Sequence, residues 1–429
     1  MQTNFSLVQL TDPDMASSES ILRSCVHCGF CTATCPTYVL LGDELDSPRG
    51  RIYQIKDMLE SGRPAPKTVV KHVDRCLSCL SCMTTCPSGV HYQHLVDHAR
   101  SYINETFNRP IFDRVFRLTL ARILPYPDRF RAALAVAWFL RPFAKLVSGR
   151  IGAMLRLVPK SIPPRSPIEG HKVHRAEGSR RKRVALLAGC AQQVLSPSIN
   201  EATIRLLNRH GVEVVVAKGA GCCGALVHHM GRAEEGHDAA RQNVDAWTRE
   251  IDGDGLDAIV INASGCGTSV KDYGFMLRGD PGYAKNAERV SALTKDIVEF
   301  MGEIGLQNPK PPEQMKVAYH SACSMQHGQQ LKDEPKALLE DAGFQVVTPL
   351  EPHLCCGSAG VYNIMQPKIA DQLKERKAAN LARLQPDAVA AGNIGCIGQL
   401  QGAVGKPVLH TVELLDWATG GPKPEKLVR

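Results

Sequence analysis

The sequence lacks any hydrophobic run long enough to cross a membrane. No stretch of about 18 uninterrupted apolar residues occurs, so we expect no transmembrane helix. The N-terminal segment MQTNFSLVQLTDPDMASSES contains neither a basic leading region nor an apolar core, and it is not typical of a secretory signal. These absences predict a cytoplasmic protein.

Motifs for nucleotide binding and for catalysis on an organic substrate are missing as well. Neither a Walker A loop nor a G-x-G-x-x-G after a strand is present, so we expect the chain to hold no nucleotide or flavin. It offers no convincing carboxylate pair or nucleophile triad. The formal net charge of +8 is compatible with nucleic acid, a membrane surface or an acidic partner and does not choose among them.

Cysteine, by contrast, is abundant. The chain has 429 residues, of which 44% are hydrophobic and 22% charged, as in a globular protein of two or three domains. It contains 16 cysteines. In a reducing compartment, this number indicates metal ligands or redox chemistry rather than a disulfide framework.

Eight of the cysteines form two copies of the motif C-x2-C-x2-C-x3-C-P. The copies are CVHCGFCTATCP, with Cys25, Cys28, Cys31 and Cys35, and CLSCLSCMTTCP, with Cys76, Cys79, Cys82 and Cys86. In bacterial-type ferredoxins this run holds [4Fe–4S] clusters, and its fourth thiolate reaches across to the other cluster. The pattern predicts one cluster on Cys25, Cys28, Cys31 and Cys86, and a second on Cys76, Cys79, Cys82 and Cys35. A pair of zinc sites is the alternative, although a third C-x2 step and a trailing C-P are not typical of zinc.

The other eight cysteines form a second, internal repeat. They are Cys190, Cys222, Cys223 and Cys266 in one half and Cys323, Cys355, Cys356 and Cys396 in the other. In each half, 32 positions separate the single cysteine from the pair, and the last cysteine follows 43 or 40 positions after the pair. Matching spacing in two copies indicates a duplication.

The secondary structure that the sequence predicts repeats with these cysteines. The strands expected are RVALLAGC, VEVVVA and DAIVINASGC in one half and KVAYHSAC, FQVVTP and DAVAAGNIGC in the other. The helices SPSINEATIRLLNRHG and DEPKALLEDAG end at Gly211 and Gly343. This alternation predicts a parallel sheet with right-handed crossovers in each half.

The carboxyl ends of parallel strands bring their loops to one crevice, so each half would place four cysteines at one edge of its sheet. Gly221, Gly224, Gly357 and Gly360 would let the backbone approach a bulky group closely. We therefore predict one redox or metal site in each half. The alternative is a vicinal disulfide or an unused buried pair.

Two ferredoxin motifs followed by two such repeats resemble the CCG-domain iron–sulfur proteins over nearly the whole chain. The segments CVHCGFCTATCPTYVLLGDELDSPRGRIY, RCLSCLSCMTTCPSGVHY and LARILPYPDRF are most similar to the iron–sulfur subunits of glycolate oxidase (glycolate dehydrogenase). The resemblance implies an electron-transfer subunit with flavin-binding partner subunits, which would oxidise glycolate or D-lactate. It also implies two [4Fe–4S] clusters and a quinone or another electron acceptor. A nucleic-acid partner is not expected.

Both repeats depart from the heterodisulfide reductase subunits of this family, which end each repeat with C-x2-C and so have a fifth thiol for a non-cubane cluster. Here the matching stretches are Cys266-Gly267-Thr268-Ser269 and Cys396-Ile397-Gly398-Gln399. A disulfide-cleaving centre is therefore not expected, whereas four thiols can hold a cubane cluster or a tetrahedral zinc. We favour an iron–sulfur centre in at least one half, with zinc as the alternative.

Residues 109–165 are strongly basic, with twelve Arg or Lys against two Asp, and they include Trp138, Phe139 and Phe143. A basic amphipathic segment suits an anionic membrane surface, such as the inner face of the cytoplasmic membrane, or a groove on a partner. The alternative is a set of helices that pack on the protein's own core. Histidines near the cysteines (His27, His228, His229, His320 and His353) are not assigned as ligands or bases, because proximity in sequence is weak evidence.

We therefore expect an α+β multidomain protein. Its parts are a helical 2[4Fe–4S] ferredoxin-like domain (1–108), a basic amphipathic helical linker (109–180) and two duplicated α/β CCG domains (181–310 and 311–429). The predicted function is electron transfer within a glycolate dehydrogenase complex. The alternatives are the corresponding subunit of anaerobic glycerol-3-phosphate dehydrogenase or of a lactate-utilisation oxidase, a thiol/disulfide reductase, and a zinc-stabilised assembly scaffold.

Overall fold

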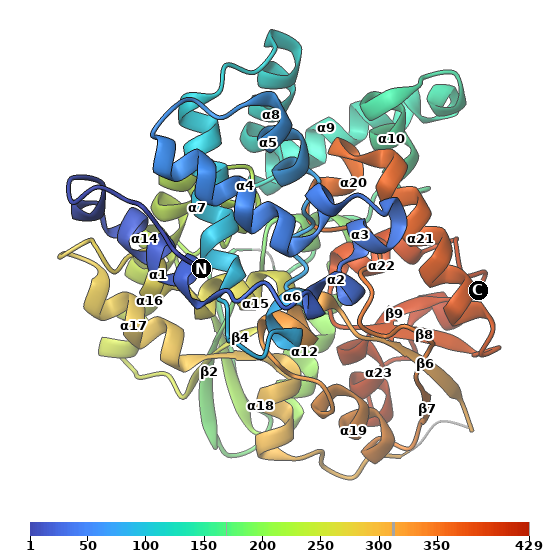
Figure 1. Ribbon diagram of the computed structural model, residues 1–429. Helices are drawn as coiled ribbons and strands as arrows, with labels where there is room; N and C mark the ends of the chain where they lie inside the picture. The colour runs from blue at the N-terminus through green and yellow to red at the C-terminus, as the bar shows by residue number, and fades with distance from the viewer. Residues whose placement is uncertain (169, 311–313, 429) are drawn as a thin grey trace.

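The computed structural model describes residues 1–168, 170–310 and 314–428. Two α/β units, green to yellow and orange to red in Figure 1, lie beside each other, and the blue and cyan N-terminal helices lie across them. This arrangement confirms the expected fold class of a helical N-terminal domain followed by two duplicated units with largely parallel sheets. The boundary expected between 310 and 311 adjoins residues 311–313, which lie outside the described residues.

The N-terminal domain is built from helices. They are η1 (Gln9–Thr11), α1 (Pro13–Ser24), α2 (Phe30–Thr34), α3 (Pro36–Leu41), η2 (Glu44–Asp46), α4 (Pro48–Ser61), α5 (Lys67–Asp74), α6 (Ser81–Thr85) and α7 (Tyr92–Thr106). Ser47 caps the start of α4 with its side chain, and Gly62 ends the helix in the left-handed conformation. Ile52, Ile55 and Leu59 of α4 are buried and pack with residues of α1, α5 and α7.

The basic segment forms α8 (Ile111–Ile123), α9 (Pro127–Leu140), η3 (Arg141–Lys145) and α10 (Gly149–Leu157). Leu120 of α8 packs with Val227 of the first α/β unit and Ile364 of the second, so this helix bridges the two units. Arg109 and Arg117 both pair with Asp74, at 2.7 and 3.0 Å. Part of the segment therefore packs on the protein's own core, which is one of the two alternatives that the sequence left open.

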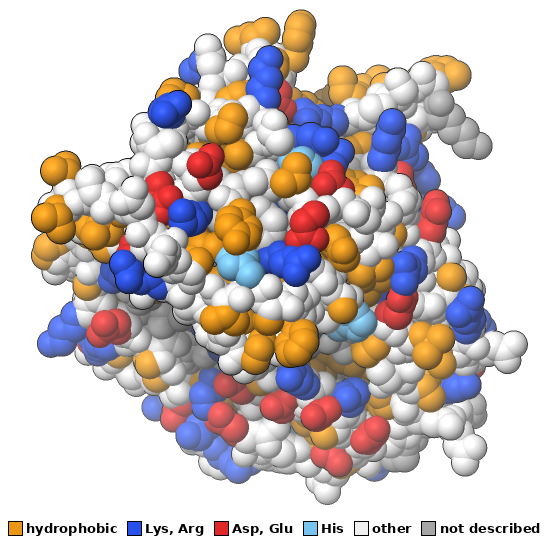
Figure 2. Space-filling view, viewed as in Figure 1, with side chains coloured by type: hydrophobic (Ala, Val, Ile, Leu, Met, Phe, Trp, Pro, Cys, Tyr) orange, Lys and Arg blue, Asp and Glu red, His pale blue; other side chains and the backbone are white. Residues whose placement is uncertain are grey.

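Another part of this segment exposes apolar side chains. Phe112, Phe139 and Leu146 are 88%, 71% and 83% exposed, and Figure 2 shows hydrophobic side chains at the tip that projects at the upper right. Among the described residues, no single helix is long and apolar enough to cross a membrane. Pro127–Ala144 and Gly149–Leu157 meet the length and composition requirement only when taken together, with a bend of 111° between them.

The first α/β unit has a five-stranded sheet in the order β1-β3-β2-β4-β5. Its strands are β1 (Lys172–His174), β2 (Lys182–Leu186), β3 (Val212–Val216), β4 (Ala258–Ile261) and β5 (Thr294–Asp296). Its helices are α11 (Ala191–Leu195), α12 (Ser198–Arg209), α13 (Ala225–His228), α14 (Ala233–Asp252), α15 (Ser264–Lys271), α16 (Tyr273–Met276), α17 (Ala284–Leu293) and α18 (Ile297–Ile304). All pairs in this sheet are parallel except β1 with β3.

The second unit has a parallel four-stranded sheet in the order β7-β6-β8-β9. Its strands are β6 (Lys316–His320), β7 (Gln345–Val347), β8 (Ala388–Ala391) and β9 (Val408–His410). Its helices are α19 (Glu334–Asp341), α20 (Tyr362–Met365), α21 (Pro367–Ala382), α22 (Ile394–Leu400) and α23 (Thr411–Ala418), with a π-helical turn, η4 (Ser324–Gly328), and a final 3₁₀ turn, η5 (Glu425–Leu427).

The two units are related as copies, in pairing and in packing. Val184 of β2 lies opposite Val214 and Ala258, and Val317 of β6 lies opposite Val346 and Ala388 at the same register. Helix α12 packs on α23, and α18 packs reciprocally on α19. One hydrophobic core spans both units, which therefore support each other.

The structure adds three strands to those expected from the sequence. β5 and β9 are fourth parallel strands in their sheets, and each ends at a helix N-cap that forms a capping box. β1 comes from residues 109–180, which were expected to be a helical linker, and it pairs antiparallel with β3. The linker is therefore not wholly helical, because its last part completes the edge of the first sheet.

Candidate metal and electron-transfer centres

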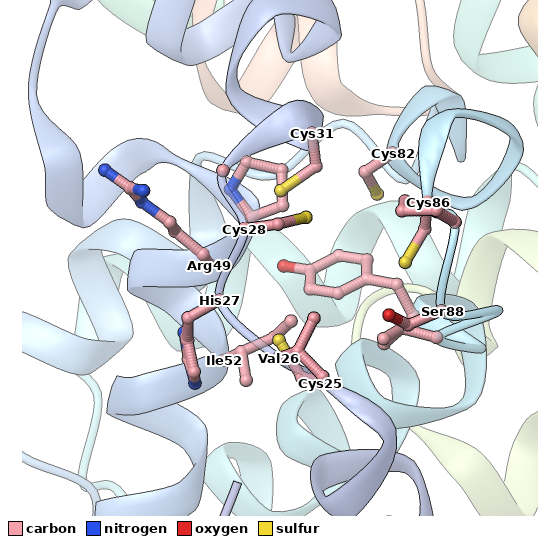
Figure 3. A pocket seen from close by; sticks show the side chains of 15 residues that line it. Cys25, Val26, His27, Cys28, Cys31, Arg49, Ile52, Cys82, Cys86 and Ser88 are labelled. Carbon is pink, nitrogen blue, oxygen red and sulfur yellow. The ribbon is translucent and has the colours of Figure 1, made fainter.

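Cysteines from the two ferredoxin motifs line a cavity of about 430 Å³ at the surface of the N-terminal domain. Cys25, Cys28, Cys31 and Cys86, which the sequence groups as one cluster site, all line this cavity. Figure 3 shows their sulfur atoms around a shared space, with Cys82 at its margin. Cys28 is exposed, so this site reaches the protein surface.

A second cavity of about 330 Å³ lies deeper in the domain. Cys35, Cys76, Cys79 and Cys82, the other predicted ligand set, line it. Pro48, Cys82 and Tyr92 line both cavities, so the two sites share a wall. Each motif thus sends its fourth cysteine to the cavity of the other motif.

The backbone of both cysteine loops has the shape that iron–sulfur clusters need. His27 and Gly29 have φ angles of 55° and 86°, and Ser78 and Leu80, at the matching positions, have 49° and 61°. A left-handed residue such as Leu80 costs about 1–2 kcal/mol, and such strain clusters at functional sites. Alternating left-handed residues turn successive N–H groups toward one concavity that binds anionic groups, iron–sulfur clusters included.

The electrostatics of the thiols also fit a bound metal cluster. Burial, and then the neighbouring cysteines, raises the pKa of Cys79 and of Cys82 well above the ordinary value. Burial raises the pKa of Cys31 to about 11. So many thiolates cannot stay ionised together unless a cationic group lies between them, and iron in a cluster supplies that charge.

A buried ion network lies behind the second cavity. The guanidinium of Arg51 donates to Cys35 Sγ at 3.8 Å, to Thr37 Oγ1 at 3.0 Å and to Asp46 Oδ1 at 3.3 Å. Asp46 also contacts His72 at 2.8 Å and is fully buried. Arg51 was not predicted from the sequence, although it lies on the same buried face of α4 as Ile55, which follows it by one helical turn.

The first α/β unit gathers its four predicted cysteines at the carboxyl ends of its strands. Cys190 and Cys222 follow β2 and β3, with their sulfur atoms 3.5 Å apart. The side chain of Cys223 contacts those of Cys222 and Cys266. Gly224 has φ of 81°, and a Cβ there would lie 2.8 Å from the carbonyl oxygen of Gly236, so only glycine fits behind the pair.

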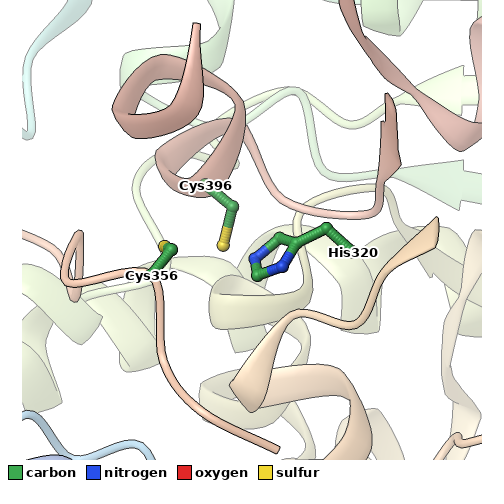
Figure 4. A group of neighbouring side chains, drawn as sticks. All are labelled: His320, Cys356 and Cys396. Atoms are coloured by element: carbon green, nitrogen blue, oxygen red, sulfur yellow. The ribbon is translucent and has the colours of Figure 1, made fainter. Parts of the chain in front are cut away.

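The second unit repeats this arrangement and adds a histidine. The sulfur atoms of Cys323 and Cys355 are 3.8 Å apart. Ligand atoms of Cys356, Cys396 and His320 all lie within 4.8 Å of one another, and Figure 4 shows the three side chains together. Burial lowers the pKa of His320 to about 3, so its imidazole is neutral at pH 7.

The other histidines near the cysteines have different surroundings. His27 stacks on Tyr53, with ring centroids 4.1 Å apart, at the edge of the first cavity. His229 contacts Asp97 at 3.1 Å and His228 contacts it at 3.8 Å, which joins the N-terminal domain to the first unit. The backbone carbonyl of His353 contacts His327 Nε2 at 3.3 Å.

The second cavity lies directly beside the second α/β unit. Leu77 and Cys79 belong to the same buried cluster as Leu354 and Cys355. The hydroxyl of Tyr362 donates to the carbonyl of Arg75 at 2.9 Å, close to the same contact. Thiols of the ferredoxin domain and of the second unit therefore approach each other through packed protein.

The cysteine sites of the two α/β units also adjoin each other. Ser264, two residues before Cys266, lies 2.7 Å from Ser324, the residue after Cys323, between their hydroxyl oxygens. The N–H of Ser264 donates to the carbonyl of Gly392 at 3.1 Å. The cysteine segments therefore adjoin one another, from the N-terminal domain to the second unit and from the second unit to the first.

Comparison with known proteins identifies the same modules. A family model described as a 4Fe-4S dicluster domain matches residues 24–90. A model described as a cysteine-rich domain matches twice, at residues 184–271 and 317–401. The matched segments contain all 16 cysteines of the chain.

Relatives match along the whole chain. The glycolate oxidase iron-sulfur subunit of Escherichia coli (strain K12) is 43% identical over 418 residues, covering 97% of this chain and 99% of that protein. A "probable glycolate oxidase iron-sulfur subunit" of Bacillus subtilis (strain 168) is 30% identical, covering 94% and 95%. Lactate utilization protein A of Geobacillus thermodenitrificans (strain NG80-2) is 27% identical over 54% of this chain and 98% of its own length.

A solved structure shares the fold. The crystal structure of a hypothetical protein from Helicobacter pylori has a TM-score of 0.55 to this chain, with 11% sequence identity, and the match covers 97% of this chain and 74% of that one. At this level of identity the likeness concerns architecture alone.

Proposed function

The chain belongs to the family of glycolate oxidase iron–sulfur subunits, and we propose that it relays electrons from a flavin-binding partner subunit to a quinone or another acceptor. We propose glycolate as the substrate of the complex, because the relatives that match over the whole chain are named for it. Substrate oxidation would take place on the partner. When bound, [4Fe–4S] clusters accept and donate single electrons.

The observation that carries this proposal is the crossed arrangement of cysteines around two adjacent cavities. We propose Cys25, Cys28, Cys31 and Cys86 as ligands of one [4Fe–4S] cluster, and Cys35, Cys76, Cys79 and Cys82 as ligands of the other. The cavity linings support this division, since all four members of each set line one cavity, while Cys82 lines both. A structural zinc needs four ligands in a closed tetrahedron, whereas the N–H groups of left-handed loops suit a larger anionic group such as a cluster.

We propose that electrons enter at the exposed cluster. Val26, Phe30 and Tyr53 are 67%, 62% and 56% exposed around the cysteine loop that begins at Cys25. Apolar and aromatic side chains of this kind are enriched at the centres of protein interfaces. The flavin-binding partner would cover this rim and bring its cofactor close to Cys28.

We further propose that each α/β unit holds a metal centre on its four cysteines. We also propose that the exposed apolar side chains of α8–α10 contact the inner face of the cytoplasmic membrane. A membrane-dissolved quinone would be within reach of a protein held there.

The proposed division of the chain follows the cysteine sets, with 1–108, 109–180, 181–310 and 311–429 as its parts. The pairing of β1 with β3 supports moving the second boundary to before Lys172.

Anaerobic co-purification tests the function. The full chain is expressed with its flavin-binding partners, and the complex is assayed with glycolate, D-lactate and glycerol 3-phosphate and an artificial acceptor. We expect glycolate to be the best substrate by kcat/KM. A preference for glycerol 3-phosphate, or a full complement of zinc with fewer than about four irons per chain in protein never exposed to oxygen, would contradict the proposal.

A further inference from the structure

His320 lies at the end of β6, where its side chain meets the cysteines of the second α/β unit. It is 1% exposed. Neither ring nitrogen has a hydrogen-bond partner among the described residues. A buried polar group without a partner costs about 1–3 kcal/mol. A metal bound to a ring nitrogen of His320 would remove this cost. Ligand atoms of Cys356 and Cys396 lie within 4.8 Å of a ring nitrogen of His320.

The first unit shows that the fold itself does not require a histidine here. When the repeats are aligned on Cys190 and Cys323, Leu187 stands at the position of His320, and it is 2% exposed. The turns after these cysteines differ too, because Cys190 leads into an α-helical turn and Cys323 into a π-helical one. π-Helical turns are rare and occur frequently at functional sites. The second unit thus differs from the first at the end of its first strand and in the turn after its first cysteine.

We propose that His320 is the fifth ligand of an iron–sulfur centre in the second unit, together with Cys323, Cys355, Cys356 and Cys396. This inference rests on the proposal that the second unit holds a metal centre, and it does not depend on which substrate the complex oxidises. Its ring nitrogens have no hydrogen-bond partner among the described residues, and ligand atoms of Cys356 and Cys396 lie within 4.8 Å, so an imidazole nitrogen is placed to act as a ligand beside these thiols. The histidine thereby occupies the role left open by the missing fifth thiol.

Four thiols and one imidazole make five donors, one more than a structural zinc takes and one more than a [4Fe–4S] cubane takes. Metal analysis of the purified chain therefore decides between iron and zinc. A buried lysine also lies close by: Lys377 is 0% exposed, its amino group donates to the carbonyl of Glu351 at 2.6 Å, and it interacts with Cys356 and Cys355.

Unequal ligation would make the two units electronically different. The first unit, with Leu187, would lack this ligand. Ligand identity is one of the factors that set the reduction potential of an iron–sulfur centre. The second unit, which also packs against the cysteines of the inner ferredoxin site, would therefore differ from the first unit in potential.

The test uses the full chain, purified anaerobically, with 15N-labelled histidine. Pulsed EPR measures nitrogen hyperfine coupling to the reduced centres, and metal analysis measures iron and zinc per chain. We expect a histidine nitrogen coupling in the wild type and iron above the roughly eight atoms that two [4Fe–4S] clusters contain. His320→Leu, which copies the first unit, should lose the coupling and the iron of this one centre while keeping about eight irons.

His320→Cys serves as the companion variant. It should retain the iron, lose the nitrogen coupling and shift the potential of the centre. If His320→Leu keeps the full iron content and the wild-type spectrum, or if the wild type shows no histidine coupling or holds zinc in place of iron, the proposal is wrong. The relay function stays separately measurable, because the reduced ferredoxin clusters give their own EPR signals in every variant.

Discussion

Arg51 lies behind the inner ferredoxin site with its guanidinium enclosed by protein. It donates to Cys35 Sγ, Thr37 and Asp46, and it is 1% exposed. Because a cluster gains a negative charge when it is reduced, a fixed positive charge beside a ligand sulfur favours the reduced state. We therefore assign Arg51 a role in setting the potential of the inner cluster.

Replacing Arg51 by Gln should lower the midpoint potential of one ferredoxin cluster and leave the other unchanged. A hydrogen bond to a charged group contributes about 1.5–3 kcal/mol, which corresponds to about 60–130 mV for a one-electron couple. A redox titration followed by EPR measures the shift. Arg51→Lys keeps the charge and should give a smaller change, whereas equal potentials in wild type and Arg51→Gln would show that Arg51 only supports the fold.

Sequence and structure differ most in what they say about single residues. The C-x2-C-x2-C-x3-C-P motif predicted which thiols group together, because its fourth thiolate reaches across to the other cluster in bacterial-type ferredoxins. Arg51 and His320 could not be predicted in this way, since their roles depend on contacts between segments far apart in the chain. For His320 a signal was present: a polar residue ends a strand at the position where the other repeat has Leu187.

At the scale of elements, the turn after each cysteine pair decides how closely the backbone can pass the neighbouring helix. Gly357 has φ of 86°, and a Cβ there would lie 2.6 Å from the carbonyl oxygen of Ala370 in α21. Gly360, three residues later, has φ of 65° but open space around a Cβ. Substitutions at the two glycines therefore distinguish the cost of the left-handed backbone, which both share, from the cost of a steric clash, which only Gly357 would have.

Gly357→Ala should destabilise the second unit, and Gly360→Ala should do so far less. The left-handed conformation costs an alanine about 1–2 kcal/mol at either position, and overpacking adds about 1–3 kcal/mol at Gly357 alone. Thermal unfolding of anaerobic protein and its iron content measure the difference. Equal unfolding temperatures for the two variants would contradict the close approach of Gly357 to α21.

Regular elements of the α/β units could be predicted from periodicity, but the short ones could not. The strands that lead to the cysteines are continuous apolar runs, which is the signature of a strand buried on both faces. β1, β5 and β9 contain only three residues each, too few to show a period. Their pairing comes from the sheet that they join, and the sequence of three residues does not specify it.

On the scale of the whole molecule, the proposed exposed cluster site would determine where a partner delivers electrons. Phe30 is 62% exposed and begins α2, next to the cavity of that site. Phe30→Glu should weaken binding of the flavin-binding partner at least about tenfold, or about 1.4 kcal/mol, because it places a charge in an apolar interface.

A titration of the partner against each variant measures that loss. Leu350→Glu is the matched control, since Leu350 is also 63% exposed but lies in the loop after β7. The iron content of Phe30→Glu should equal that of the wild type. Unchanged binding with unchanged iron would place the partner on another face of the molecule.

The duplication could be predicted from the sequence, whereas the way in which the two copies pack on each other could not. Matching intervals between cysteines revealed two copies, but the reciprocal packing of α12 on α23 and of α18 on α19 depends on the folded surfaces. The same holds for the contact of Cys79 with the second unit rather than the first. That contact places the inner ferredoxin site beside the second unit.

The proposed electron relay can be followed by EPR of the anaerobic complex frozen after glycolate is added. With the flavin-binding partners present, we expect signals of reduced [4Fe–4S] clusters on this chain. Cys86→Ser should remove the signal of the exposed cluster and Cys35→Ser that of the inner one, although each cysteine lies in the motif of the other cluster. If glycolate oxidation proceeds in the absence of any acceptor while the clusters of an iron-replete chain stay oxidised, this chain does not relay the electrons.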